Sequence, residues 1–243
     1  MPVFYVDEEA IQPPQITIRG ELARHLACSL RMQPGERCQF ADGRRRYLGE
    51  LTRVTPAAVT ATILTDEPAA PPVRPVTLAQ AVIKGHRMDW LLQKAAELGA
   101  ARIIPITTSR TVVRPREERR DAQQRRWEKI LREAGQQSGR SRPPELSPAS
   151  DLRVALAQAP ADAARLILWE SETHALLSAH LSTLPSDQPI FLLIGPEGGL
   201  SAEEVAAATD RGFVSVSLGP LTLRAETATL AALAIIHGAA RHD

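Results

Sequence analysis

Short segments in which hydrophobic and polar residues alternate fill the first part of the chain and predict β-strands. They lie at residues 3–6, 15–18, 37–40, 46–51 and 59–64. Asp42 and Gly43, between the third and fourth segments, are typical of a hairpin turn. Residues 20–30 fit a helix, which ends before Pro34 and Gly35. Several short strands joined by turns predict a small β-barrel.

A proline-rich segment at residues 67–75 interrupts this pattern and predicts a stiff linker. Beyond it, hydrophobic runs alternate with helical stretches. The runs lie at residues 76–83, 102–106, 166–169, 190–194 and 213–218, and the helices at 88–98, 117–137, 174–184, 202–211 and 225–240. This alternation predicts an α/β domain in which helices cover both faces of a parallel sheet. We therefore expect two domains, at residues 1–72 and 73–243, and a ligand at the carboxyl ends of the second domain's strands.

The composition excludes several classes of protein. Of the 243 residues, 44% are hydrophobic and 23% are charged, so the chain can bury a core and is not of the disordered class. No apolar run is long enough to span a membrane, and the first residues lack the pattern of a signal peptide. Cys28 and Cys38 have no metal-ligand residues at a useful spacing. We expect a cytoplasmic protein with reduced thiols and no metal.

Basic residues are distributed unevenly, although the net charge is only +1. Between residues 110 and 142 the chain has eleven Arg and Lys residues against five Asp and Glu residues. Such a stretch is either a solvated helix face or a site for RNA phosphates, and the sequence leaves both open.

The hydrophobic run at residues 190–194 leads directly into a glycine-rich loop, Gly195-Pro196-Glu197-Gly198-Gly199. Ser201 and Glu204 follow it with the spacing of a capping box for the next helix. Glycine lets a ligand approach the backbone closely, although a strand-to-helix turn can also need glycine for its own geometry. The spacing matches no phosphate-binding motif, and Glu197 would repel an anion, so a cationic ligand fits better.

A second loop, at residues 218–228, follows the next hydrophobic run and contains Arg224 and Glu226. One interpretation is a surface ion pair beside the start of a helix. The other is an unpaired Arg224 that holds a phosphate or the electron-rich edge of a base.

These two loops resemble the cofactor loops of SPOUT methyltransferases and, more narrowly, those of the bacterial 16S ribosomal RNA (uracil-N3)-methyltransferases. Other stretches of the chain resemble the narrower family in the same order, and they lie at residues 22–35, 84–99 and 126–143. The resemblance extends over nearly the whole chain. It departs from the family pattern at Leu221, where a basic residue is common, and at Gln136, where an acid is common.

The resemblance implies a SPOUT α/β domain with a C-terminal trefoil knot, preceded by a PUA-like β-barrel domain that binds RNA. It implies a homodimer that uses S-adenosyl-L-methionine to methylate N3 of a uridine in 16S ribosomal RNA of the 30S subunit, the family target being U1498. The cofactor-binding residues that it implies are Leu168, Glu170, Gly195, Pro196, Gly199, Leu218, Gly219, Leu221, Leu223 and Thr227. We expect RNA contacts from Arg31, Arg110, Arg114 and Arg140.

Methyl transfer from a sulfonium is an in-line displacement, which requires mainly alignment and the exclusion of water. Uracil N3 carries a proton and is a poor nucleophile until that proton leaves, so catalysis needs a base or a cation that stabilises the imide anion. Arg224 is the candidate cation, because arginine keeps its proton at neutral pH. Glu226 is the candidate base, although a helix-capping role explains it equally well.

Two other functions stay open. One is a SPOUT methyltransferase that acts on another RNA, which the predicted barrel domain and the motifs outside the two loops disfavour. The other is a non-catalytic RNA-binding factor in ribosome assembly, which would have little need for intact cofactor loops.

Overall fold

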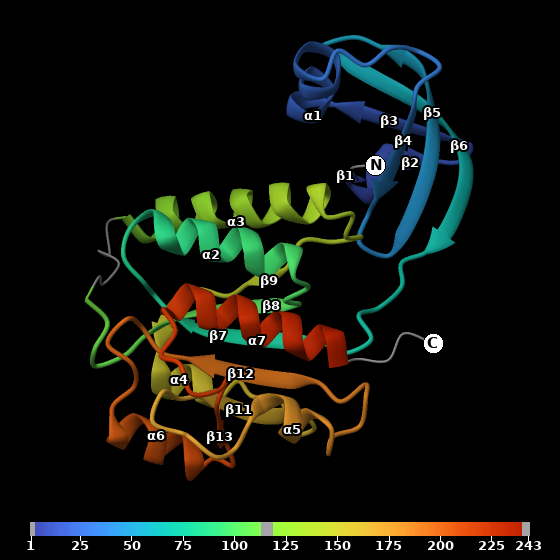
Figure 1. Cartoon of the computed structure of the whole chain (residues 1–243). Coiled ribbons are helices and arrows are strands. Elements are labelled where there is room, and N and C mark those ends of the chain that lie inside the picture. Colours follow the sequence, from blue (N-terminus) through green and yellow to red (C-terminus); the bar gives the residue numbers. More distant parts are fainter. Residues whose placement is uncertain (1–2, 113–118, 240–243) are drawn as a thin grey trace. The chain divides into compact units, whose positions relative to one another are not determined.

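The computed structural model describes residues 3–112 and 119–239, and the chain divides into two compact units (Figure 1). The first unit consists of Met1–Pro71 and Gly135–Pro143, and the second of Pro72–Ala134 and Pro144–Asp243. Nothing in the hydrophobic pattern predicts that residues 135–143 pack with the first unit.

The first unit is a six-stranded sheet. Its strands are β1 (Val3–Tyr5), β2 (Ile11–Gln12), β3 (Gln15–Arg19), β4 (Arg37–Ala41), β5 (Arg45–Val54) and β6 (Ala58–Pro68), in the order β1-β4-β5-β6-β3-β2. The sheet curls around a core that includes Phe4, Ile18, Phe40 and Leu51 (Figure 1). Its two edge strands, β1 and β2, do not pair with each other in the described part of the chain. The expected barrel is therefore a curled half-barrel.

The helical segments of this unit differ from the expected single helix at residues 20–30. Here α1 (Gly20–Arg24) continues as one turn of π-helix, η2 (His25–Ser29), and a short 3-10 turn, η1 (Glu8–Ala10), lies between β1 and β2. Strand β6 runs to Pro68 because its last residues pair with the start of β5. The predicted linker was therefore wrong at its first two residues, which are strand.

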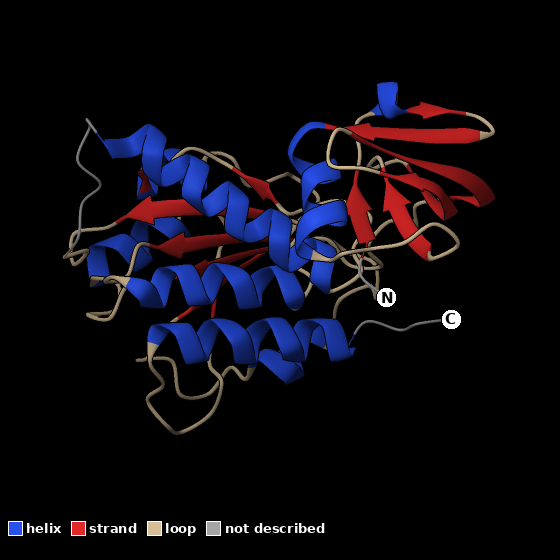
Figure 2. Ribbon diagram, turned by 90° about the horizontal axis from the view of Figure 1, so that it is seen from above, coloured by secondary structure: helices blue, strands red, loops and turns tan. Residues whose placement is uncertain are grey.

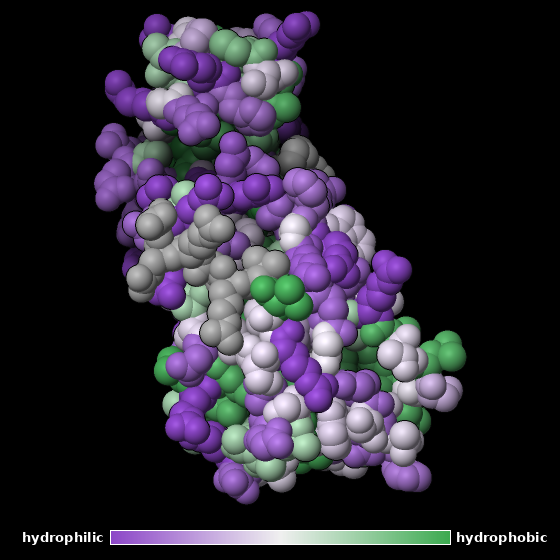
Figure 3. Space-filling model, turned by 90° about the vertical axis from the view of Figure 1, so that its left-hand side faces the viewer, coloured by the Kyte–Doolittle hydropathy of each residue, from purple (hydrophilic) through white to green (hydrophobic). Residues whose placement is uncertain are grey.

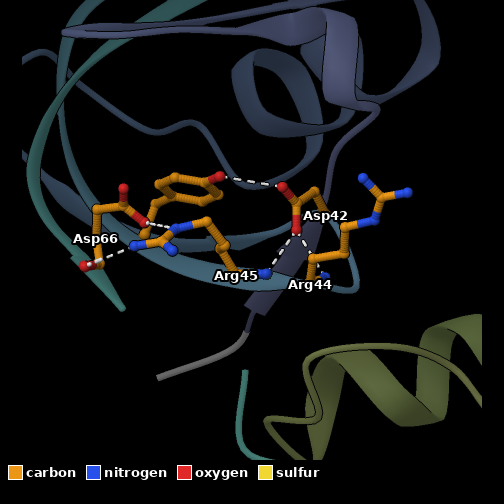
Figure 4. A network of polar contacts seen from close by, with 5 residues as sticks. Asp42, Arg44, Arg45 and Asp66 are labelled. Atoms are coloured by element: carbon orange, nitrogen blue, oxygen red, sulfur yellow. Dashed lines mark hydrogen bonds and ion pairs between the residues drawn. The ribbon is translucent and has the colours of Figure 1, made fainter. Parts of the chain in front are cut away.

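The predicted hairpin turn at Asp42 and Gly43 is confirmed, and a polar network holds it (Figure 4). Asp42 accepts hydrogen bonds from the backbone N–H groups of Arg44 (2.8 Å) and Arg45 (2.7 Å) and from the Tyr47 hydroxyl (3.0 Å). Burial would raise the pKa of Asp42, but these donors together lower it, whereas burial and the bond to Asp42 raise the pKa of Tyr47 to about 12. Asp42 therefore stays ionised and Tyr47 stays a donor at neutral pH. The Arg45 guanidinium pairs with Asp66 on the neighbouring strand.

The second unit contains the predicted parallel sheet. Its strands are β7 (Val76–Ala81), β8 (Arg102–Thr107), β9 (Glu145–Leu146), β10 (Ser150–Asp151), β11 (Ala164–Leu168), β12 (Ile190–Ile194) and β13 (Val214–Val216). The order is β10-β8-β7-β12-β11-β13, β9 also pairs with β8, and every pairing is parallel. Each residue of β12 is buried, as expected of a strand covered on both faces. The trefoil knot stays a prediction.

Helices cover both faces of this sheet (Figures 1 and 2). On one face α2 (His86–Glu97), α3 (Arg120–Gln137), α5 (Leu177–Leu181) and α7 (Ala225–Ala239) share a core with the sheet, and α7 lies between α2 and α5. On the other face α4 (Leu152–Leu156) and α6 (Ala202–Thr209) form a second core. None of the helices described is both long and apolar enough to cross a membrane.

The helix predicted at residues 174–184 is shorter in the structure. Leu176 has an extended backbone and bridges to Ser217, so α5 begins only at Leu177. The side chain of Glu172 accepts hydrogen bonds from the N–H groups of His174 and Ala175 and shapes the turn before it. A side-chain turn and one bridge thus replace the first helical turn.

A buried arginine ties together the starts of two central strands. Arg74, two residues before β7, is 1% exposed, and its guanidinium donates to the carbonyl oxygens of Ser186 and Pro185, which precede β12. Its Nη1 has no hydrogen-bond partner among the described residues. Burial lowers the pKa of Arg74.

Replacing Arg74 with alanine is expected to lower the free energy of unfolding by about 2–4 kcal/mol, because it leaves two carbonyl groups unpaired and a cavity behind. Urea unfolding of the full chain measures this difference. Arg153→Ala removes an exposed arginine on α4 and is expected to change stability by less than about 0.5 kcal/mol. Equal losses for the two variants would contradict the role assigned to Arg74.

Candidate active site

A cavity of about 930 Å³ lies at the carboxyl ends of β11, β12 and β13. Residues 168–170, 172–174, 194–199 and 217–225 line it, together with Arg87, Leu176 and Ala228. Figure 3 looks onto the side towards which β12 runs and shows exposed hydrophobic side chains among hydrophilic ones. Leu176, Leu221 and Leu223 are exposed hydrophobic residues of the lining. The cavity lies where parallel α/β sheets bind their ligands.

The glycine loop after β12 has no room for side chains at two of its positions. Gly199 has a φ of +71°, and a Cβ added to it would lie 2.0 Å from Oε1 of Glu170. A Cβ on Gly195 would lie 3.0 Å from the backbone of Gly199. The N–H of Gly199 donates to the carbonyl of Pro196 at 2.9 Å. These glycines bring the backbone and the Glu170 carboxylate together at the cavity wall.

The predicted capping box that ends this loop is confirmed. The Ser201 hydroxyl accepts from the N–H of Glu204 at 3.2 Å, and the Glu204 carboxylate accepts from the N–H of Ser201 at 2.9 Å. The other carboxylate oxygen of Glu204 accepts from the N–H of Ser109. Helix α6 therefore begins at Ala202 and fixes the end of the glycine loop.

The second loop presents an arginine without a polar partner. The side chain of Arg224 is exposed, lines the cavity, and makes no hydrogen bond or ion pair with any residue that the structure describes. Its carbonyl accepts from the N–H of Ala228 at 2.8 Å, which fixes its backbone at the start of α7. A backbone held by this hydrogen bond and a guanidinium with no partner among the described residues suit Arg224 to a ligand.

A second arginine of the cavity is paired. Arg87, in the first turn of α2, donates from Nη2 to Oε1 of Glu197, and its Nη1 lies 3.7 Å from Oε1 of Glu226. The N–H of Lys84 donates to the same Glu197 oxygen at 3.0 Å. Burial raises the pKa of Glu197, but the bond from Lys84 and the charge of Arg87 outweigh this and lower it below its usual value. Glu197 is therefore a carboxylate at neutral pH.

Comparison with known proteins decides what kind of site this is. The profile of the RNA methyltransferase domain family matches residues 70–237. Ribosomal RNA small subunit methyltransferase E from Bacillus subtilis is 31% identical over 93% of this chain and 90% of its own length. The protein of the same name from Mycobacterium bovis is 33% identical over 96% of this chain and 90% of its own length. The chain belongs to the ribosomal RNA small subunit methyltransferase E family.

Solved structures of similar proteins agree with this family. The Neisseria gonorrhoeae ribosomal RNA small subunit methyltransferase E, bound to S-adenosyl methionine, is 32% identical with a TM-score of 0.84, covering 96% of this chain and 95% of that one. A putative methyltransferase from Legionella pneumophila, in complex with the same cofactor, is 32% identical with a TM-score of 0.85, covering 98% and 97%. The family and the SPOUT α/β fold that the sequence resemblance implied are thereby confirmed.

Most of the cofactor residues expected for this family come together around the cavity. The residues of that set that line it are Leu168, Glu170, Gly195, Pro196, Gly199, Leu218, Gly219, Leu221 and Leu223, and Arg224 lines it too. The structure places Thr227 exposed in the first turn of α7, outside the lining, where Ala228 is the nearest lining residue along the chain. Glu226 is buried beside Arg87 and does not line the cavity either.

Arg87 is a cavity residue that was not predicted as a site residue. It lies within residues 84–99, which resemble the family. The pairing with Glu197 and Glu226 joins positions more than one hundred residues apart, so no local pattern could reveal it. Trp169, Glu172 and His174 also line the cavity without having been predicted.

The arginines expected to contact RNA lie in different places. Arg110 donates to the carbonyl of Gly198 at 2.8 Å, so its guanidinium is bound to the glycine loop. Arg31 is exposed in the first unit and has a φ of 53°. Burial, opposed by the nearby Tyr5, lowers the pKa of the partly buried Arg140. Arg114 lies outside the described residues.

Proposed function

We propose that the chain transfers a methyl group from S-adenosyl-L-methionine to N3 of a uridine, U1498, in 16S ribosomal RNA of the 30S subunit in the cytoplasm. Membership of the family supports the ribosomal RNA substrate and the methyl transfer. The observation that carries the proposal is an unpaired arginine, Arg224, in a cavity whose other wall is a glycine loop. No other described residue lines that cavity with an unpaired guanidinium.

The residues of the cavity fit adenosylmethionine. A volume of about 930 Å³ is within the range of sites for cofactors of this size. Glu170 and Glu172 line it and favour a ligand that carries a sulfonium and an ammonium group. Gly195 and Gly199 leave the backbone open to close approach. When bound, the cofactor supplies an electrophilic methyl group on its sulfonium.

The expected cofactor residues divide into two groups. Leu218, Gly219 and Leu223 would hold the adenine with backbone groups, and Leu168, Glu170, Gly195 and Gly199 would hold the rest. Pro196 and Leu221 add apolar surface to the same wall. Thr227 lies outside the lining, in the first turn of α7, so its effect on the ligand would be indirect, through the position of that turn.

Arg224 would stabilise the anion that uracil becomes when N3 loses its proton. The developing charge is shared with the carbonyl oxygens beside N3, and a guanidinium can donate hydrogen bonds to such an oxygen. Glu226 is the candidate proton acceptor, but its burial and its pairing with Arg87 favour a part in holding the site over one in moving a proton. Burial of the reacting groups against the apolar residues of the second loop would exclude water.

The direct test is methyl transfer from labelled adenosylmethionine to purified 30S subunits that lack the modification, followed by nucleoside analysis. Label recovered as 3-methyluridine at U1498 is the expected result. Label in another nucleoside would discard the uridine target and keep a methyltransferase of another RNA. Measurable cofactor binding with no label would likewise exclude the 30S subunit as the substrate, and no binding would favour the assembly-factor alternative.

RNA binding by the first unit is proposed from a concentration of arginines. Arg142 belongs to residues 135–143, which pack with the first unit. Its Cβ lies 3.8 Å from the position of a Cβ on Gly43, in the hairpin turn that also carries Arg44. Arg142 is exposed and has no hydrogen bond or ion pair among the described residues, and its charge helps to lower the pKa of the nearby Arg140. Like charges held close together in this way suit a polyanion such as the RNA backbone.

Arg142→Ala is expected to weaken binding to ribosomal RNA several-fold and to reduce the slope of log affinity against log salt by about one unit, as loss of one phosphate contact does. Filter binding at several salt concentrations measures both. Arg37→Ala, which removes an arginine already paired with Glu50 at 3.2 Å, is the matched control in the same unit. An unchanged slope for Arg142→Ala would contradict the contact.

The homodimer is proposed from the family resemblance alone. Light scattering of the purified chain tests it, and a mass near 26.4 kDa would show a monomer.

A further inference from the structure

The two arginines that line the cavity differ in what they are free to do. Arg224 has no polar partner among the described residues, whereas both terminal nitrogens of Arg87 are directed at carboxylates. Two protein carboxylates therefore compensate the charge of the Arg87 guanidinium and set its orientation. Arg87 therefore acts on the site through the groups that it holds.

The Arg87 cluster, which we define as Arg87, Glu197 and Glu226, joins three segments. Arg87 belongs to the start of α2, Glu197 to the glycine loop after β12, and Glu226 to the first turn of α7. Glu197 lines the cavity, and Glu226 directly follows two lining residues, Arg224 and Ala225. The cluster thus fixes the two cavity loops relative to each other.

Glu226 depends on Arg87 for charge compensation. Glu226 is 8% exposed. Its Oε1 faces Arg87, and its Oε2 has no hydrogen-bond partner among the described residues. Removal of the cation from a buried carboxylate is costly, because the remaining charge has neither solvent nor partner. Glu197, which shares the same guanidinium, would then repel Glu226, and the two loops would move apart.

We propose that Arg87 is a positioning residue for methyl transfer: it holds the glycine loop and the start of α7 at the separation that cofactor binding and Arg224 require. This inference rests on the proposed function for its cofactor and reaction. The proposed role of Arg87 is exerted through these two loops, without a contact to the methyl donor or the reacting uracil.

The test compares Arg87→Gln with the wild-type chain in cofactor affinity, measured by calorimetry without RNA, and in kcat and KM on 30S subunits. Arg87→Gln is expected to weaken adenosylmethionine binding about tenfold and to lower kcat by about tenfold more, since small misplacements at a reacting centre are costly. Arg87→Lys keeps the positive charge but not the two directed nitrogens, so its cofactor affinity and kcat are expected to lie between those of Arg87→Gln and the wild-type chain. An affinity equal to that of the wild type would overturn the proposal.

Two further variants separate positioning from a general loss of stability. Glu226→Gln removes the buried charge, so Arg87→Gln added to it is expected to cost only about twofold in cofactor affinity. Lys94→Gln breaks the Lys94–Glu97 ion pair on the same helix. This pair is about as exposed as the Arg87–Glu197 pair and lies outside the cavity, so its loss is expected to leave cofactor affinity unchanged. A full tenfold loss in the double variant, or an equal loss in Lys94→Gln, would overturn the proposal.

The outcomes also separate this proposal from the proposed function. A wild-type chain that binds adenosylmethionine but methylates no 30S subunit would exclude the uridine target, and the cofactor affinities of the variants would still test the role of Arg87. A wild-type chain that methylates 30S subunits would support the proposed function, and an Arg87→Gln variant of equal activity and affinity would overturn the role of Arg87. A chain that binds no adenosylmethionine would overturn both.

Discussion

Replacing Arg224 with alanine is expected to lower kcat for 30S methylation by about 10³-fold while leaving adenosylmethionine affinity within about twofold of the wild-type value. The guanidinium lines the cavity without a polar partner among the described residues, so its removal leaves none of their polar groups unpaired. Its proposed ligand is the uracil anion, which forms only as the reaction proceeds. An interaction made only in the transition state raises kcat and contributes little to cofactor binding.

The measurement pairs single-turnover methylation with calorimetry of the cofactor alone. Arg224→Lys is the informative companion, because it keeps the charge but loses the planar pair of donors, and it is expected to recover part of the rate. Loss of cofactor affinity equal to the loss of rate would show that Arg224 holds the cofactor and would remove it from the proposed role. An unchanged rate would remove it from the reaction altogether.

Local sequence signals predicted the parts of the site that local geometry determines. The apolar run at residues 190–194 is β12, and the Ser201–Glu204 spacing is a capping box. Both could be predicted because each shows in residues that are close together in the sequence. The same holds for the Asp42-Gly43 turn. Once strand ends are known, the rule that ligands bind there brings the glycine loop and Arg224 together.

Features that depend on distant neighbours did not show in the pattern. Residues 135–143 read as the end of a basic helix, and only contacts with the first unit reveal that they return to it. The helix expected from residue 174 begins at Leu177, because Leu176 bridges to Ser217 some forty residues later. Glu226 was expected as a candidate base and Thr227 as a cofactor contact, but the helical turn that starts at Ala225 places both outside the cavity lining.

Gly199→Ala is expected to weaken adenosylmethionine binding by about 100-fold or more and to lower the free energy of unfolding by about 1–2 kcal/mol, the cost of a left-handed backbone for a residue with a side chain. The larger effect has a separate cause. The added methyl group would lie 2.0 Å from Oε1 of Glu170, so this carboxylate must leave its place on the cavity wall. Calorimetry with the cofactor and urea unfolding measure the two quantities independently.

Gly212→Ala separates the loss of stability caused by a left-handed backbone from the loss of cofactor affinity caused by displacing Glu170. Gly212 has a similar φ, +80°, and does not line this cavity. Among the described residues, the only atom within 4 Å of a Cβ there would be Nη1 of Arg165, at 3.9 Å. This variant is expected to lose the same stability and no cofactor affinity. Equal losses of affinity in Gly199→Ala and Gly212→Ala would mean that instability alone weakens binding. Glu170→Ala tests which group binds the cofactor. A large loss of cofactor affinity in this variant would show that the cofactor needs the Glu170 carboxylate. Normal affinity would mean that the loop backbone beside Gly199 makes the contact.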